Sequence, residues 1–91
     1  MQASDTQRRI EILPQLLEAI RALQSGIDSG RFGFDGALAE YVEQTDNELS
    51  RAFRDALEEF RSGLSRPEAL QNVAKRVGTD DVKLFVDALV R

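Results

Sequence analysis

The feature that most constrains this chain is how closely its helix start and stop signals follow one another. Within residues 58–81, "EEFRSGLSRPEALQNVAKRVGTDD", one amphipathic pattern ends at Gly63, a second runs to Gly78 and a third begins directly afterwards. Ser65 and Glu68 have the spacing of a capping box, with a proline in the first turn, where a missing N–H breaks no helical hydrogen bond. Gly78 suits the left-handed position that ends many helices. Short helices joined by tight turns are therefore expected.

Helical periodicity also runs through the rest of the chain, and no stretch alternates with the period of two that is typical of strands. We therefore predict an all-α fold, a compact antiparallel bundle of about five helices. It forms one domain over residues 1–91, with residues 1–8 as a disordered or lead-in segment. The predicted core positions are, helix by helix, Leu13, Leu16, Leu17, Ile20, Leu23 and Ile27; Ala37, Leu38, Tyr41 and Val42; Leu49, Ala52, Phe53, Ala56, Leu57 and Phe60; Ala69, Leu70, Val73, Ala74 and Val77; and Val82, Phe85, Val86 and Leu89.

Two boundaries of the first helix have alternative interpretations. Pro14 interrupts the pattern, so it either kinks a long helix or marks the first turn of a shorter one that follows a lead-in. The helix ends either at Gly26 or a turn later at Gly30, and the periodicity through Ile27 favours the later end.

Side-chain caps are predicted at three further helix starts. Asp35 is the expected N-cap of the second helix, and Thr45 with Glu48 has the capping-box spacing for the third. Thr79 is expected to cap the fifth helix, where the two aspartates that follow complement the positive end of the helix dipole.

Composition limits the chemistry that the chain can carry out. It contains neither cysteine nor histidine, which removes thiolate metal sites, the commonest general base and the commonest zinc ligand. Its net charge is −4 and its arginines are interleaved with acids, so nucleic acid is not an expected partner. Ser65 and Thr79 are interpreted as helix caps, because no base accompanies either hydroxyl. We predict no catalytic residue, metal ligand or cofactor site, and therefore no enzyme.

The last helix carries an unusually broad apolar band. Val82, Phe85, Val86 and Leu89 form one face, and three further apolar residues widen it. A band of this width indicates burial on more than one side or contact with a partner. We predict that this face mediates self-association in a homodimer.

The order of these signals resembles the type II secretion system F-domain family. Its members are the inner-membrane platform proteins of type II secretion, type IV pili and tight-adherence (Tad) pili. The resemblance rests on "LPQLLEAIRALQSG" (13–26), "GALAEYV" (36–42) and the run from "LSRAF" to "DALV" (49–90). Its most distinctive part is the arrangement from Gly63 to Leu70, and "VGTDD" is most similar to the tight-adherence branch.

The resemblance implies a helical domain at the cytoplasmic face of the inner membrane. In the family, transmembrane helices anchor this domain, which contacts an assembly ATPase and other platform subunits during pilus biogenesis or secretion. Gly63, Ala69 and Leu70 match the family motif, where their role is to end one helix and pack the next tightly, and the family has no catalytic residues.

This chain departs from the family in two ways, because it ends without the usual sixth helix and has a longer linker, "GIDSGRFGFDG" (26–36). The longest nearly apolar run, "LFVDALV", is far shorter than the roughly 20 residues that span a bilayer, so the chain itself is expected to be soluble. An unrelated all-α adaptor or dimerisation domain of a cytosolic protein remains the alternative.

Overall fold

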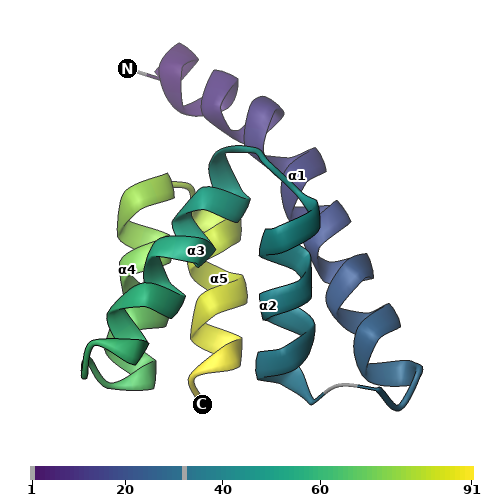
Figure 1. The fold of residues 1–91 in the computed structure, drawn as a ribbon. Helices are drawn as coiled ribbons and strands as arrows, with labels where there is room; N and C mark the ends of the chain where they lie inside the picture. The colour runs from purple at the N-terminus through teal and green to yellow at the C-terminus, as the bar shows by residue number, and fades with distance from the viewer. Residues whose placement is uncertain (1, 32) are drawn as a thin grey trace.

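Five helices follow one another in alternating directions (Figure 1). The computed structural model describes residues 2–31 and 33–91, with side chains from residue 6 onward. Among these residues there is no strand, so the predicted all-α bundle is confirmed. The helices are α1 (Gln2–Asp28), α2 (Phe34–Gln44), α3 (Glu48–Arg61), α4 (Arg66–Val77) and α5 (Asp80–Leu89).

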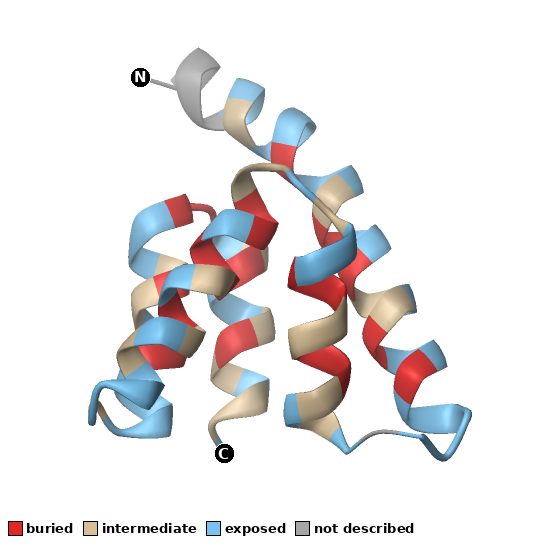
Figure 2. Ribbon diagram, in the orientation of Figure 1, coloured by how far each residue is buried: buried red, intermediate tan, exposed pale blue. Residues whose placement is uncertain are grey.

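The core is centred on Phe53 of α3, the largest of the fully buried side chains. Its ring meets Tyr41 of α2 and Phe85 of α5 edge-on, with centroids 6.3 and 6.5 Å away. Such pairs add about 0.5–1.5 kcal/mol each to the stabilisation from buried area. Phe53 therefore connects three helices, and the buried residues of all five face the interior between them (Figure 2).

The predicted core is confirmed in α2 and in most of α3 and α4, but it is partly wrong in α1. The buried stripe of α1 consists of Ile12, Leu16, Ala19 and Leu23. Leu17, predicted to be buried, is 50% exposed. The apolar residues of α1 form two neighbouring stripes, and the other helices fully bury only one of them. Four predicted core residues, Leu13, Leu17, Ile27 and Phe60, are exposed.

The helix α1 continues through Pro14, so the proline does not mark its first turn. Residues 2–8 are continuous with the rest of this helix, and residue 1 lies outside the described residues. Arg8 holds this part of α1 against the bundle. Its guanidinium donates to Glu48 at the start of α3 (Nη1–Oε1 2.8 Å) and to the carbonyl of Val77 at the end of α4 (2.6 Å).

The glycine stops lie where three helices end. α1 ends at Asp28, so the later of its two predicted ends is confirmed and Gly26 lies inside the helix. After α3, Gly63 has a φ of 113°, which only glycine adopts without strain. The N–H groups of Gly63 and Leu64 donate to the carbonyls of Phe60 (3.1 Å) and Glu59 (3.0 Å), the pattern of a Schellman motif. This motif turns the chain sharply into α4.

The predicted N-caps of α4 and α5, Ser65 and Thr79, are confirmed, but the Glu68 carboxylate accepts from the Ser65 hydroxyl and not from the Ser65 N–H as in a capping box. The Ser65 hydroxyl accepts from the N–H of Glu68 (3.3 Å) and donates to its carboxylate (2.8 Å). Gly78 ends α4 with a φ of 79°. The buried Thr79 hydroxyl accepts from the N–H of Val82 (3.4 Å).

The predicted caps of α2 and α3 are wrong. Asp35 lies in the first turn of α2 rather than before it, where Arg66 of α4 engages its carboxylate (Nη2–Oδ1 3.0 Å). The cap of α3 is Asn47, two residues after Thr45. Asn47 Oδ1 accepts from the N–H of Ser50 and Ser50 Oγ accepts from that of Asn47, both at 2.8 Å. Asparagine is a stronger N-cap than threonine, which accounts for the later start.

Tyr41 provides a test of the core, because its hydroxyl is buried without a hydrogen-bond partner among the described residues. Burial is the main cause that raises its pKa to about 12. In Tyr41→Phe, the free energy of unfolding at neutral pH should stay unchanged or rise by up to about 1–2 kcal/mol, because an unsatisfied polar group is removed. Urea denaturation followed by circular dichroism measures this, and a loss of more than 1 kcal/mol would contradict it.

The same variant predicts a pH dependence, because Tyr41 is the only tyrosine in the chain. The pKa of Tyr41 in the folded protein lies above the ordinary value of 10.0, because burial disfavours the ionised phenol. Ionisation of Tyr41 therefore does not lower the free energy of unfolding below about pH 10, but lowers it as the pH rises towards 12. The wild type should therefore lose more stability than Tyr41→Phe over this range. Equal losses would show that the phenol ionises as readily in the folded protein as in the unfolded one.

Candidate interaction surface

The predicted motif from Gly63 to Leu70 shapes the junction between α3 and α4. Ala69 and Leu70 are 2% and 4% exposed and pack in the core, whereas Ser65 and Glu68 lie at the surface and cap α4. The motif residues do not converge on a pocket. Within the residues that the structure describes, no group of three acidic side chains is placed to hold a metal ion.

The predicted self-association face of α5 points into the protein itself, which corrects that prediction. Val82 and Val86 are 0% exposed. Phe85 and Leu89 are partly buried and pack against the same core. The breadth of the apolar band therefore reflects burial on more than one side of α5, which packs against both α4 and α1. Among the large apolar residues of α5, Leu84 is the exposed one, at 68%.

An outward apolar stripe lies instead on α1, and sequence reasoning missed it. Ile10 is 62% exposed, and Leu13, Leu17 and Ile27 are between 39% and 50% exposed. With Ile20, which is half-buried against the core, and the polar Gln24, these residues follow the alternating three- and four-residue steps of a heptad seam. The signal was present in the sequence, because Ile12 and Ala19 complete a second stripe beside the first. Two stripes on one helix indicate two packing partners.

A shallow recess accompanies this stripe on the outer side of α1. It is lined by Pro14, Gln15, Leu17, Glu18 and Arg21. Apart from Gln15, these residues occupy positions i, i+3, i+4 and i+7, and four residues so arranged form the hole that accepts a side chain from a facing helix. The recess therefore has the shape that helix-to-helix packing requires.

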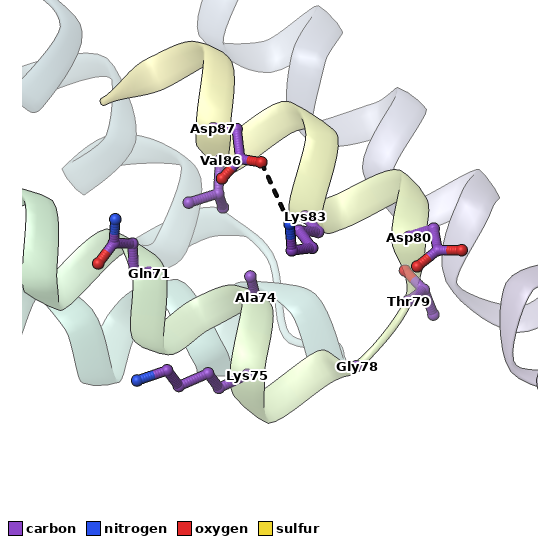
Figure 3. Close-up of a pocket in the computed structure, with 9 residues that line it drawn as sticks. All are labelled: Gln71, Ala74, Lys75, Gly78, Thr79, Asp80, Lys83, Val86 and Asp87. Carbon is purple, nitrogen blue, oxygen red and sulfur yellow. Dashed lines mark hydrogen bonds and ion pairs between the residues drawn. The ribbon is translucent and has the colours of Figure 1, made fainter. Parts of the chain in front are cut away.

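A second cleft, of about 410 Å³, lies between α4 and α5 (Figure 3). Ala74 and Val86 contribute apolar lining, and Lys75 and Lys83, the only two lysines of the chain, lie along it. Lys83 Nζ lies 3.5 Å from the carboxylate of Asp87. The cleft therefore combines an apolar part with charges of both signs, as the margins of protein–protein contacts often do.

Charged side chains join the helices around these surfaces. The hydrogen bond from Arg8 is the main cause that lowers the pKa of Glu48. Across the α3–α4 junction, Arg76 and Asn72 both donate to the carboxylate of Glu59, and the bond from Arg76 is the main cause that lowers its pKa. These groups are engaged in holding the helices in place.

Comparison of the chain with protein-family models, with curated proteins and with solved structures finds no match in any of the three. Within the described residues, no helix has both the length and the apolar character needed to cross a bilayer.

Arg8→Met tests the junction of α1, α3 and α4. At neutral pH the free energy of unfolding should fall by about 0.5–1 kcal/mol, a modest loss because both charged side chains are more than a third exposed. The folded pKa of Glu48 lies below its ordinary value of 4.5, so the pair stabilises fully above that value and loses its contribution as the pH falls through the lowered pKa. Denaturation at a series of acidic pH values should show a smaller loss in the variant.

The matched control for this prediction is Arg51→Met. Arg51 pairs with Asp46 at 2.9 Å, but both side chains are at least 60% exposed, so removal should change stability by less than about 0.5 kcal/mol. Equal effects of the two substitutions would show that the Arg8 pair has no special structural role.

Proposed function

We propose that this chain is a non-catalytic helical domain that acts through protein–protein contacts. Its place is in a membrane platform protein of pilus assembly or type II secretion, on the cytoplasmic face of the inner membrane. The observation that carries the contact function is the pair of surfaces on a well-packed bundle, the apolar stripe of α1 and the mixed-charge cleft between α4 and α5.

The engagement of the polar groups supports this proposal. The hydroxyls of Ser65 and Thr79 cap helices, and the carboxylates of Glu48 and Glu59 accept hydrogen bonds from arginines of neighbouring helices. These side chains stabilise the fold. We therefore assign the function to the exposed surface of the domain.

The platform setting rests on the resemblance of the chain from Gly63 to Leu70 and on the "VGTDD" join. In that setting the partners are the assembly ATPase and other platform subunits. We assign the ATPase contact to the α4–α5 cleft, where an apolar part lies among Lys75, Lys83 and Asp87. A protruding loop or helix of the partner could insert an apolar side chain and pair its own charges at the margin.

The second candidate function is that of an all-α adaptor or dimerisation domain of a cytosolic protein. The outward stripe of α1 favours it, because such a stripe can pair two proteins without a membrane. The reading frame around this chain separates the candidates. Flanking membrane spans and a neighbouring assembly ATPase gene support the platform, and their absence supports the adaptor.

Binding to the assembly ATPase encoded beside this chain tests the platform proposal directly. The purified domain should bind it in a surface-immobilised assay. Lys83→Glu should weaken binding about tenfold, because it reverses a charge at the cleft and breaks the contact with Asp87.

The control for this assay is Arg61→Glu, the same change of charge on the exposed end of α3, away from the cleft. It should leave binding unchanged. No binding by the wild type would contradict the ATPase contact. Binding that both variants weaken equally would show a general charge effect instead of docking in the cleft.

A further inference from the structure

The outward stripe of α1 requires a helix as its partner. From Ile10 to Ile27 it spans about 26 Å of helix and keeps heptad spacing throughout, with Gln24 at one of the seam positions. The exposed residues along the outer side of α1 are visible in Figure 2.

The recess lies beside the stripe on the surface of α1 and shares Leu17 with it. Pro14, Leu17, Glu18 and Arg21 surround a point between residues 17 and 18, and Leu17, half exposed, projects beside that point. A two-fold axis through it would carry Leu17 of each copy into the recess of the other. A surface that contains both the inserting side chain, here Leu17, and the recess that accepts it can pair with a second copy of itself in a closed two-fold dimer.

We propose that two copies of this chain pack antiparallel along α1, with Leu17 of each copy in the recess of the other. In this arrangement residue n of one helix faces residue 35 − n of its partner, as follows from an axis between 17 and 18. Ile10 then faces Ser25 of the other copy, two residues before Ile27 at the end of that copy's stripe. The second copy thus covers Ile10 and Leu17, the two most exposed residues of the stripe.

The charges beside the recess fit this pairing. Arg21 faces the Pro14 position of the other copy, and Glu11 and Glu18 of that copy lie about one helical turn to either side. Among the described residues of a single copy, neither Glu18 nor Arg21 forms an ion pair, and the contact of Glu11 with Arg8 is long, at 3.9 Å. Antiparallel pairing places Arg21 of one copy near Glu11 and Glu18 of the other. A parallel pair would set Arg21 beside Arg21.

This dimer is independent of the proposed ATPase contact, because that contact uses the cleft between α4 and α5. The stripe is short, so the interface lies at the small end of specific interfaces and should dissociate on dilution. Either proposal can therefore fail while the other stands.

Sedimentation equilibrium of the full chain over a range of concentrations up to the millimolar tests the association. The wild type should move from monomer to dimer. Leu17→Glu should weaken the association at least tenfold, because it removes the apolar side chain that fills the recess and brings a second carboxylate close to Glu18 of the other copy. Leu84→Glu, the same change at an exposed leucine of α5, should leave it unchanged. A monomeric wild type at every concentration, or a stronger effect of Leu84→Glu than of Leu17→Glu, would overturn the proposal.

Charge reversal tests the pairing without touching the apolar stripe. Arg21→Glu and Glu18→Arg should each weaken self-association, because each brings like charges together across the axis. A mixture of the two variants should form a heterodimer more readily than either alone forms a homodimer, since opposite charges then meet again. A mixture that associates no better than its components would contradict the antiparallel contact.

Cysteine cross-linking tests the orientation, because the chain has no cysteine of its own. Leu17→Cys lies near the axis and should form an intermolecular disulfide on mild oxidation. Gln24→Cys lies on the same stripe, but the two copies of this residue would be about 20 Å apart, beyond the reach of a disulfide. Efficient cross-linking at both positions would indicate parallel helices and overturn the proposed geometry.

Discussion

The packing of one apolar stripe of α1 against the other helices determines both the inside and the outside of this protein. Ile12, Leu16, Ala19 and Leu23 are each no more than 5% exposed. Because α1 is the longest helix and contacts α2, α3 and α5, its rotation about its own axis is fixed by this packing. The second stripe, about a quarter of a turn or more around the helix, is therefore left facing outward.

The short helices of the second half depend on local signals in addition to packing. A helix of ten to fourteen residues is marginal by itself, so it depends mainly on the packing of its apolar face, to which caps and interhelical hydrogen bonds add. The Gly63 turn and the Ser65 cap join α3 to α4 within a few residues, and Gly78 and Thr79 do the same between α4 and α5. These junctions set the relative positions of the two helices that form the α4–α5 cleft.

The sequence predicted these junctions well, because caps and glycine stops act over three or four residues. It predicted the start of α3 wrongly, because the Thr-x-x-Glu spacing of Thr45 and Glu48 was given more weight than the stronger capping preference of Asn47. The long-range ties of Arg8 to Glu48 and Val77 join residues 40 and 69 positions apart, and no local pattern indicates such contacts.

The surfaces were predicted less well than the core for a related reason. Periodicity shows that a residue is apolar and on a given face, but not whether the chain's own helices or another molecule cover that face. Both α1 and α5 carry more apolar surface than contact with one neighbouring helix can bury. The fold covers the band of α5, with Val82 and Val86 fully buried, and leaves the second stripe of α1 outside. Which band would be covered depended on how all five helices pack together.

The measurement that tests this account most directly is the solvent exposure of the α1 methyl groups, obtained by NMR with a soluble paramagnetic probe. In dilute solution the methyl signals of Ile10, Leu13 and Leu17 should be strongly broadened, while those of Ile12, Leu16 and Leu23 remain sharp. As the protein concentration rises, Leu17 should become protected and Leu84 should not. Equal broadening of both α1 stripes, or protection of Leu17 in the dilute monomer, would contradict the account.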